Sequence, residues 1–124
     1  MRKRRAVPPD DISPVDFFTR WVPERVAADA ERRAKLAKTS EKIVFTFTEP
    51  SGDGSESFTV VIDHGVVRGE VGGTHEPDLR VELDEEVWRE LNRGAMSAPE
   101  ALLRRRVKIH GDFLLALKLH LILG

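Results

Sequence analysis

The side chains that could do chemistry in this 124-residue chain are few and scattered. There is no cysteine, which excludes a disulfide framework, a thiolate metal site and a cysteine nucleophile. No histidine has a partner at the spacing of a metal-ligand motif; the four are His64, His75, His110 and His120. The sequence also has no phosphate-binding GxxxxGKS/T loop, no GxSxG elbow and no HExxH motif. We therefore expect no catalytic residue, metal or cofactor, and a protein that is not an enzyme.

Carboxylates beside histidines do not change this expectation. Asp63 precedes His64, and His75 is followed by an acidic residue, but no nucleophile completes a triad. The acidic residues 84–86 open a helical pattern, where they suit the positive end of the helix dipole. Compared with a ligand-binding domain or a protein-interaction module, an enzyme is the weakest interpretation. It would require these histidines and a carboxylate to converge around a pocket.

Two basic clusters suggest surfaces rather than active sites. The formal net charge is -1, so nothing drives the whole chain toward nucleic acid. Residues 104–106 with Lys108 predict a basic ridge, which could orient the domain on a membrane or keep an exposed strand from pairing. The N-terminal cluster predicts either a solvated tail or transient contact with an anionic membrane; its members are Arg2, Lys3, Arg4 and Arg5.

Length and composition indicate one globular domain. Hydrophobic residues make up 40% and charged residues 33% of the chain. Residues 1–13 read as a flexible basic tail, and residues 14–124 as the domain. No apolar run reaches the roughly 20 residues of a membrane helix, and the N-terminus lacks the apolar core of a signal peptide. We expect a cytoplasmic protein.

The elements that must position these residues follow a segregated order. A helix is predicted from Pro14 with Ser13 as its cap, a second helix from Pro23, and helix continuing over 24–38. Alternating residues over 43–71 predict an antiparallel meander, and "DLRVEL" at 78–83 predicts a fourth strand. Further predicted elements are a helix from Asp84 to Gly94, a short helix after Ser97, a strand over 105–111 and a helix over 112–123.

This order predicts the α+β class. We expect a five-stranded, mostly antiparallel sheet with helices packed on one face and the other face largely exposed to water. The last helix raises a question, because Lys118 and His120 are the only polar side chains after Asp112 and they fall on opposite sides. Its far side could be covered by the same chain, by a second subunit or by a bound apolar ligand.

The segment "RRRVKIHGDFLLALKLHLIL" resembles the C-terminal signature of the sterol carrier protein type 2 family. That signature is a basic-flanked strand, a glycine with Asp or Asn, and an apolar helix close to "LALKL". The segments "PDLRVELDEEVWRELNRGAMSAPEALL" and "KIVFTFTEPSGDGSESFTVVIDHG" resemble earlier parts of the same family in the same order. The resemblance covers about residues 14–124.

The resemblance implies a hydrophobic cavity between sheet and helices that binds a fatty acyl chain, a sterol-like molecule or a prenyl tail, without catalysis. The implied lining residues are Phe17, Trp21, Val81, Trp88, Leu91, Met96, Leu102, Leu103, Phe113, Leu114, Leu117 and Leu121. The alternative is a protein-interaction or dimerisation module, such as a lipid-binding accessory factor of quinone biosynthesis or a homodimer. If the chain binds lipid, a charged residue in place of Leu117 should abolish lipid uptake. If it self-associates, sedimentation should show an oligomer.

Overall fold

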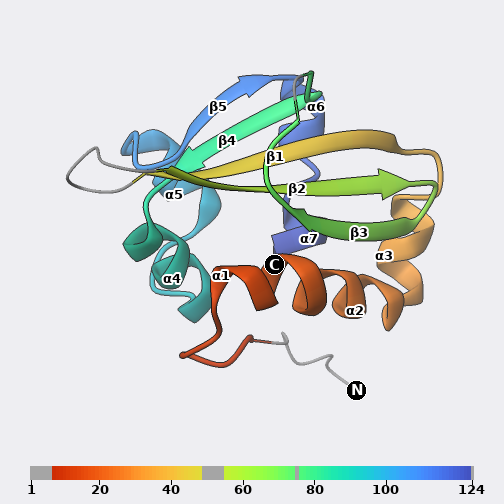
Figure 1. The fold of residues 1–124 in the computed structure, drawn as a ribbon, viewed down its shortest axis with the longest axis horizontal. Helices are drawn as coiled ribbons and strands as arrows, with labels where there is room; N and C mark the ends of the chain where they lie inside the picture. Colours follow the sequence, from red (N-terminus) through yellow and green to blue (C-terminus); the bar gives the residue numbers. More distant parts are fainter. Residues whose placement is uncertain (1–6, 49–54, 75, 124) are drawn as a thin grey trace.

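Five strands form one mixed sheet in the order β3-β2-β1-β4-β5. The computed structural model describes residues 7–48, 55–74 and 76–123 (Figure 1). Every strand pair is antiparallel except β1 with β4, which run parallel. The strands are β1 (Ser40–Thr48), β2 (Ser55–Asp63), β3 (Val66–Val71), β4 (Leu79–Leu83) and β5 (Lys108–Gly111). The predicted fold class and meander are confirmed.

Helices lie behind and below the sheet in the view of Figure 1. Their bounds are α1 (Pro14–Asp16), the π-helical turn η1 (Phe17–Trp21), α2 (Val22–Ala27), α3 (Ala30–Lys35), α4 (Glu85–Arg93), α5 (Ala98–Leu103), α6 (Phe113–Ala116) and α7 (His120–Leu123). None of the helices in the described ranges has the length and apolar character needed to cross a bilayer.

The core forms where the inward side chains of the strands meet the N-terminal helical segment. The ring of Phe18 stacks on Phe58 with centroids 5.0 Å apart and lies 4.8 Å from the ring of Phe45. The backbone approaches the sheet closely here, since a Cβ added to Gly69 would lie 1.7 Å from the carbonyl oxygen of Phe18. Glycine on β3 therefore lets η1 pack directly against the strand.

The predicted break at Pro23 is wrong. Residues 14–27 form one continuous helical path, in which the π-helical turn η1 ends at Trp21, two residues before Pro23. Proline has no backbone N–H, so an α-helix would lack one backbone hydrogen bond at Pro23. The wider π-helical turn before it lets the helix continue without that bond. The prediction of one helix over 24–38 is also wrong, because the chain leaves helix after Ala27 and restarts at α3. Asp29 accepts from the backbone N–H groups of Glu31 and Arg32 and caps the new helix.

The outer face of the sheet is less exposed to water than predicted. Since β3 and β4 run in the same direction, the segment joining them must return along the sheet, and Figure 1 shows it passing in front of β1 and β2. The Thr59 hydroxyl donates a 2.7 Å hydrogen bond to the Gly72 carbonyl. Thr59 and Val44 are 4% and 1% exposed as a result.

Four of the predicted helix starts are confirmed. Ser13, Asp84, Ser97 and Asp112 each accept hydrogen bonds from backbone N–H groups in the first turn of their helices. Gly94 ends α4 with φ 76°, as the C-cap pattern predicts.

The single helix predicted over 112–123 is instead two short helices joined by turns. Around the junction, the Lys118 and Leu119 N–H groups donate to the carbonyls three residues earlier. This tighter winding rotates the two halves relative to each other. Leu121 and Ile122 consequently reach the core, whereas Phe113 and Leu114 do not.

Candidate functional site

The predicted lipid-cavity residues fall into three groups by burial. Those inside the core are Phe17, Val81, Trp88, Met96 and Leu121, all 7% exposed or less. Trp21 and Leu91 are half-buried and pack against that core. The exposed group contains Leu102, Leu103, Phe113, Leu114 and Leu117. The structure thus brings only part of the predicted set together, and assignment of the whole set to a lipid site stays a prediction.

The buried group fills the space between sheet and helices. Phe17 and Trp88 meet edge to face with ring centroids 5.2 Å apart, and Phe47 lies 5.5 Å from Trp88. The indole Nε1 of Trp88 is buried and has no hydrogen-bond partner among the described residues. In this conformation these aromatic side chains contact one another.

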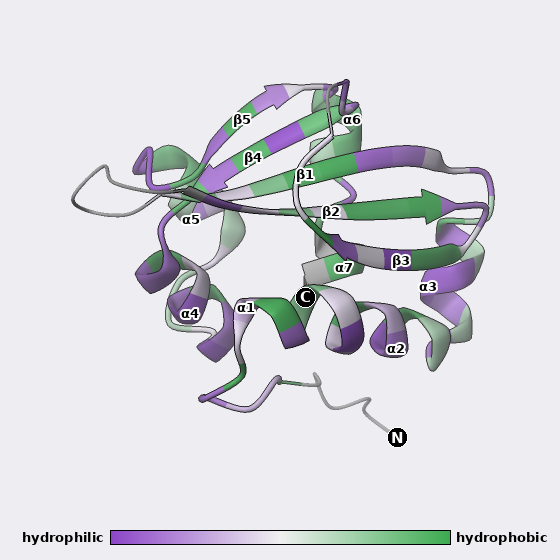
Figure 2. Ribbon diagram, in the orientation of Figure 1, coloured by the Kyte–Doolittle hydropathy of each residue, from purple (hydrophilic) through white to green (hydrophobic). Residues whose placement is uncertain are grey.

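The exposed group flanks β5 at both ends. Leu102 and Leu103 end α5 just before the strand, and they are 40% and 85% exposed. Phe113, Leu114 and Leu117 follow the strand at 67%, 71% and 58% exposed, and Figure 2 colours α6 as strongly hydrophobic. We call these two groups together the β5 apolar surface. The two groups lie at opposite ends of the strand (Figure 1), and each leaves apolar side chains exposed that a ligand or partner could cover.

Half-buried Ile109 adds to this surface and was missed by the sequence prediction. It pairs directly with Val81, whose side chain belongs to the core, so both face the helical side of the sheet. The alternation of "VKIHG" already predicted an inward Ile109.

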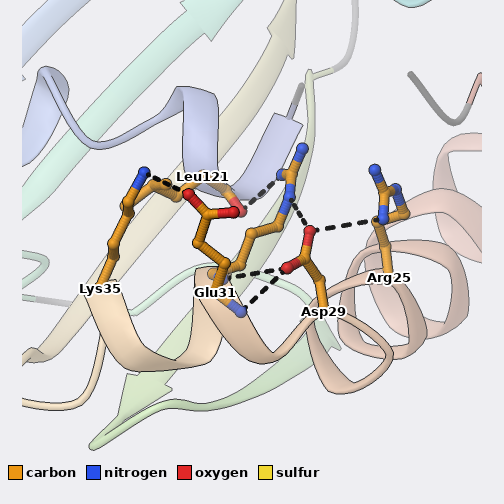
Figure 3. Close-up of polar contacts among 6 residues, drawn as sticks. Arg25, Asp29, Glu31, Lys35 and Leu121 are labelled. Atoms are coloured by element: carbon orange, nitrogen blue, oxygen red, sulfur yellow. Dashed lines mark hydrogen bonds and ion pairs between the residues drawn. The ribbon is translucent and has the colours of Figure 1, made fainter. Parts of the chain in front are cut away.

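Polar contacts hold the C-terminal segment against α3. The guanidinium Nη1 of Arg32 donates to the Leu121 carbonyl at 2.9 Å, and its Nε lies 3.3 Å from Asp29 Oδ2. Figure 3 shows this arrangement, with the 3.9 Å ion pair between Arg25 and Asp29 beside it. The Lys118 ammonium adds a 3.3 Å hydrogen bond to the hydroxyl of buried Thr39. These contacts hold the C-terminal segment, which contains the exposed Leu114 and Leu117, against the rest of the fold.

Negative charge gathers where α6 begins. Partial burial raises the pKa of the Glu41 carboxyl, and the nearby Asp112 and Asp78 raise it further. Lys118 opposes this shift. Lys118 lies in the turn between α6 and α7 and lowers the pKa of Glu41, so its charge acts on these carboxylates from that turn.

Two surface depressions are lined mostly by polar and charged residues, and neither includes any predicted cavity residue. One is a shallow notch beside α4, lined by Pro8, Pro9, Asp10, Arg89, Asn92 and Arg93. The other has a volume of about 230 Å³ and is lined by Thr48, Glu82, Leu83, Asp84, Arg105, Arg106 and Lys108.

The two histidines whose side chains the structure describes, His64 and His110, form no reaction centre together. His64 Nδ1 lies 2.7 Å from its neighbour Asp63, and His110 Nε2 lies 3.5 Å from Glu82. His75 and the side chain of His120 lie outside the described residues, as do the basic residues 2–5. Within the described ranges, no group of three or more His, Asp and Glu side chains could hold a metal ion.

The sheet order and the apolar C-terminal segment together define the class of small α+β domains with sterol-carrier topology. The chain belongs to the SCP-2 sterol transfer family, whose model matches residues 22–124. The predicted family is confirmed. No curated protein matches the sequence significantly.

Solved structures share the fold at low sequence identity. Palmitated SCP2L2 from Aedes aegypti has a TM-score of 0.68 at 21% identity, covering 85% of this chain and 89% of that one. Apo sterol carrier protein 2 from Yarrowia lipolytica has a TM-score of 0.65 at 16% identity, covering 88% of each chain.

A much larger enzyme also contains this fold. The sec-alkylsulfatase Pisa1 from Pseudomonas sp. has a TM-score of 0.68 at 18% identity, covering 91% of this chain and 17% of that one. A double mutant of the sulfatase reaches a TM-score of 0.73 at 18% identity, covering 95% of this chain and 19% of that one. The chain therefore spans less than a fifth of these proteins, and the likeness concerns the fold alone.

Proposed function

We propose that this chain binds the apolar part of a lipid, such as a fatty acyl chain, a prenyl tail or a sterol-like molecule, and catalyses no reaction on it. The observation that carries the proposal is the β5 apolar surface in a member of the SCP-2 sterol transfer family. The palmitated Aedes aegypti relative supports an acyl chain as the first ligand to test. We place this activity in the cytoplasm.

Free energy of apolar burial makes such binding feasible. A 16-carbon chain gains about 12 kcal/mol gross at ~0.8 kcal/mol per buried CH₂. The cost of immobilising the ligand reduces this gain and leaves room for micromolar affinity. An empty apolar cavity of about 400 Å³ would cost on the order of 10 kcal/mol, so a ligand-free domain is expected to close over its own core.

Ligand entry then requires a movement that separates part of the helical layer from the sheet. The turn between α6 and α7 supports this step, because it lies between the exposed Phe113 and Leu114 of α6 and the contact that anchors Leu121. In the proposal, the buried residues of the predicted set become contacts for the inner part of the ligand. The exposed leucines cover its outer part.

Titration with a fluorescent fatty acid tests the proposal. We expect Leu114→Asp and Leu117→Asp to weaken binding at least ten-fold, since each places a charge against the apolar ligand. Val66→Asp is the matched control, because Val66 is 69% exposed but lies at the start of β3, away from β5. Native mass spectrometry of the freshly purified protein checks for a co-purified lipid. Equal affinity of all folded variants would contradict the proposal.

A protein-interaction or dimerisation module is the second candidate, and the high exposure of Phe113 and Leu103 supports it. In that case the β5 apolar surface is buried against a second copy or a partner enzyme. Sedimentation separates the two candidates, because a monomer at micromolar concentration counts against self-association. Membrane contact through residues 2–5 stays a prediction.

A further inference from the structure

The 230 Å³ depression lies at the corner where β1 and β4 end and β5 begins. Its cationic lining consists of Arg105, Arg106 and Lys108. Its carboxylates already have partners: Glu82 lies 3.5 Å from His110, and Asp84 accepts the Val87 N–H at 2.8 Å. By contrast, the three cations have no ion pair or side-chain hydrogen bond with any described residue. As far as the described residues go, the depression therefore offers positive charge that no carboxylate pairs with.

Arg105 occupies a backbone position that the fold alone would give to glycine. Its φ is 58°, in the left-handed region. The Arg106 N–H donates to the Ala101 carbonyl at 2.8 Å, and the Arg105 N–H donates to the Leu102 carbonyl at 3.1 Å. This is the Schellman pattern at the end of α5, in which the left-handed residue is most often glycine. An arginine in this backbone conformation costs stability that glycine would not, which favours a role for its side chain outside folding.

An apolar tip adjoins these cations. Leu103, 85% exposed, directly precedes the basic run 104–106, and Leu102 beside it is 40% exposed. A leucine gains free energy by entering hydrocarbon, whereas arginines beside it can remain at the level of the phosphates. Nucleic acid offers phosphates but no hydrocarbon for the leucine. The combination favours an anionic bilayer.

We propose that the end of α5 and the start of β5 form a membrane-docking corner. Leu103 inserts among the acyl chains of an anionic bilayer, and Arg105, Arg106 and Lys108 bind lipid phosphate groups in and around the depression. This surface is distinct from the N-terminal basic residues 2–5. The proposal goes beyond lipid binding and does not require it, because docking needs no ligand inside the domain.

Flotation with vesicles tests the proposal. The full chain is mixed with phosphatidylcholine vesicles that contain either 30% phosphatidylserine or none. The parent protein is expected to float only with the anionic vesicles. Each basic residue near such a surface contributes roughly a five-fold gain in partitioning, so Arg105→Gln with Arg106→Gln is expected to lower it about 25-fold. Leu103→Ser is expected to lower it about ten-fold.

The matched control is Arg33→Gln with Lys38→Gln. This pair makes the same charge change with exposed residues in and after α3, which lies at the other end of the molecule from α5 (Figure 1). It is expected to retain nearly full partitioning. A second comparison neutralises residues 2–5. The proposal would be overturned if partitioning depended on residues 2–5 or on the control pair and not on Arg105 and Arg106. It would also be overturned if the parent protein did not float with the anionic vesicles.

Arg105→Gly separates docking from folding. If arginine is kept for docking, glycine raises Tm by roughly 2–6 °C because it relieves the left-handed strain, and yet it lowers vesicle partitioning about five-fold. A lower Tm, or unchanged partitioning, would contradict a docking role for Arg105. Titration with the fluorescent fatty acid in the absence of vesicles is expected to be unchanged in the Arg105 and Arg106 variants, which lie outside the proposed ligand contacts, so failure of docking and failure of lipid binding are seen separately.

Discussion

Arg32 on α3 donates a 2.9 Å hydrogen bond to the backbone carbonyl of Leu121, 89 residues further along the chain. The guanidinium is held in place by Asp29, whose carboxylate also caps α3 (Figure 3). A single aspartate thus connects the start of one helix to the position of the C-terminal segment. The side chains of Leu121 and Ile122 enter the core beside this contact, at 7% and 1% exposed.

Replacement of Arg32 by alanine is expected to loosen the C-terminal segment. The loss of a charge-assisted hydrogen bond and of the contacts with Asp29 should cost about 1–3 kcal/mol of unfolding free energy. Denaturant unfolding measures the cost, and amide hydrogen exchange should show faster exchange over residues 117–123 than elsewhere. Arg33→Ala is the control, because Arg33 is exposed on the same helix, and it should change stability by less than about 0.5 kcal/mol. Equal effects of the two substitutions would contradict the anchor.

Gly69→Ala is expected to be among the most damaging small substitutions in the chain. The added Cβ would lie 1.7 Å from the Phe18 carbonyl oxygen, so η1 must move off the sheet. We expect a loss of about 3 kcal/mol or more, measured by thermal or denaturant unfolding. At Gly73 an added Cβ would meet Ser57 and Val44 at 3.8 and 3.9 Å, which are ordinary contacts, so Gly73→Ala should fold with nearly parent stability.

Neighbouring leucines on α6 are expected to differ sharply in their contribution to stability. Leu115 is 1% exposed and lies in the core, so Leu115→Ala should cost about 2–5 kcal/mol. Leu114 is 71% exposed, and Leu114→Ala should change stability by no more than about 0.5 kcal/mol. Similar losses at both positions would mean that Leu114 is buried in solution, for example in a dimer, and sedimentation would then be the next measurement.

Glu41 predicts a pH dependence of stability. Burial and the neighbouring Asp112 and Asp78 raise its pKa above the ordinary value of 4.5, so the folded protein holds a proton that the unfolded chain has released. Stability contributed by this group is present at low pH and falls as pH rises through the window just above 4.5. Glu41→Gln should therefore be more stable than the parent protein at pH 7, and the difference should disappear below about pH 4. Unfolding curves across this range measure the effect, and a less stable variant at pH 7 would contradict it.

Local chemistry in the sequence predicted most of the fold. Ser13, Asp84, Ser97 and Asp112 mark helix starts because their side chains bond backbone groups only two or three residues away. Alternation over 43–71 predicted the meander because side chains of a strand point to opposite faces. The family could be identified for the same reason, since an ordered series of local patterns covers most of the chain.

Long-range packing decided what these patterns could not. The parallel pairing of β1 with β4 sends the connecting segment across the outer face, and this burial of Val44 is not visible in the alternation of β1. The apolar pattern after Asp112 did not predict the break between α6 and α7, because the contact of Arg32 with Leu121 joins residues far apart in sequence. Within this segment the fold buries Leu115 and Leu121 and leaves Leu114 and Leu117 in the β5 apolar surface. The sequence by itself determined which residues are apolar, and only the tertiary structure decided which of them the fold buries and which it leaves for a ligand, a partner or a membrane.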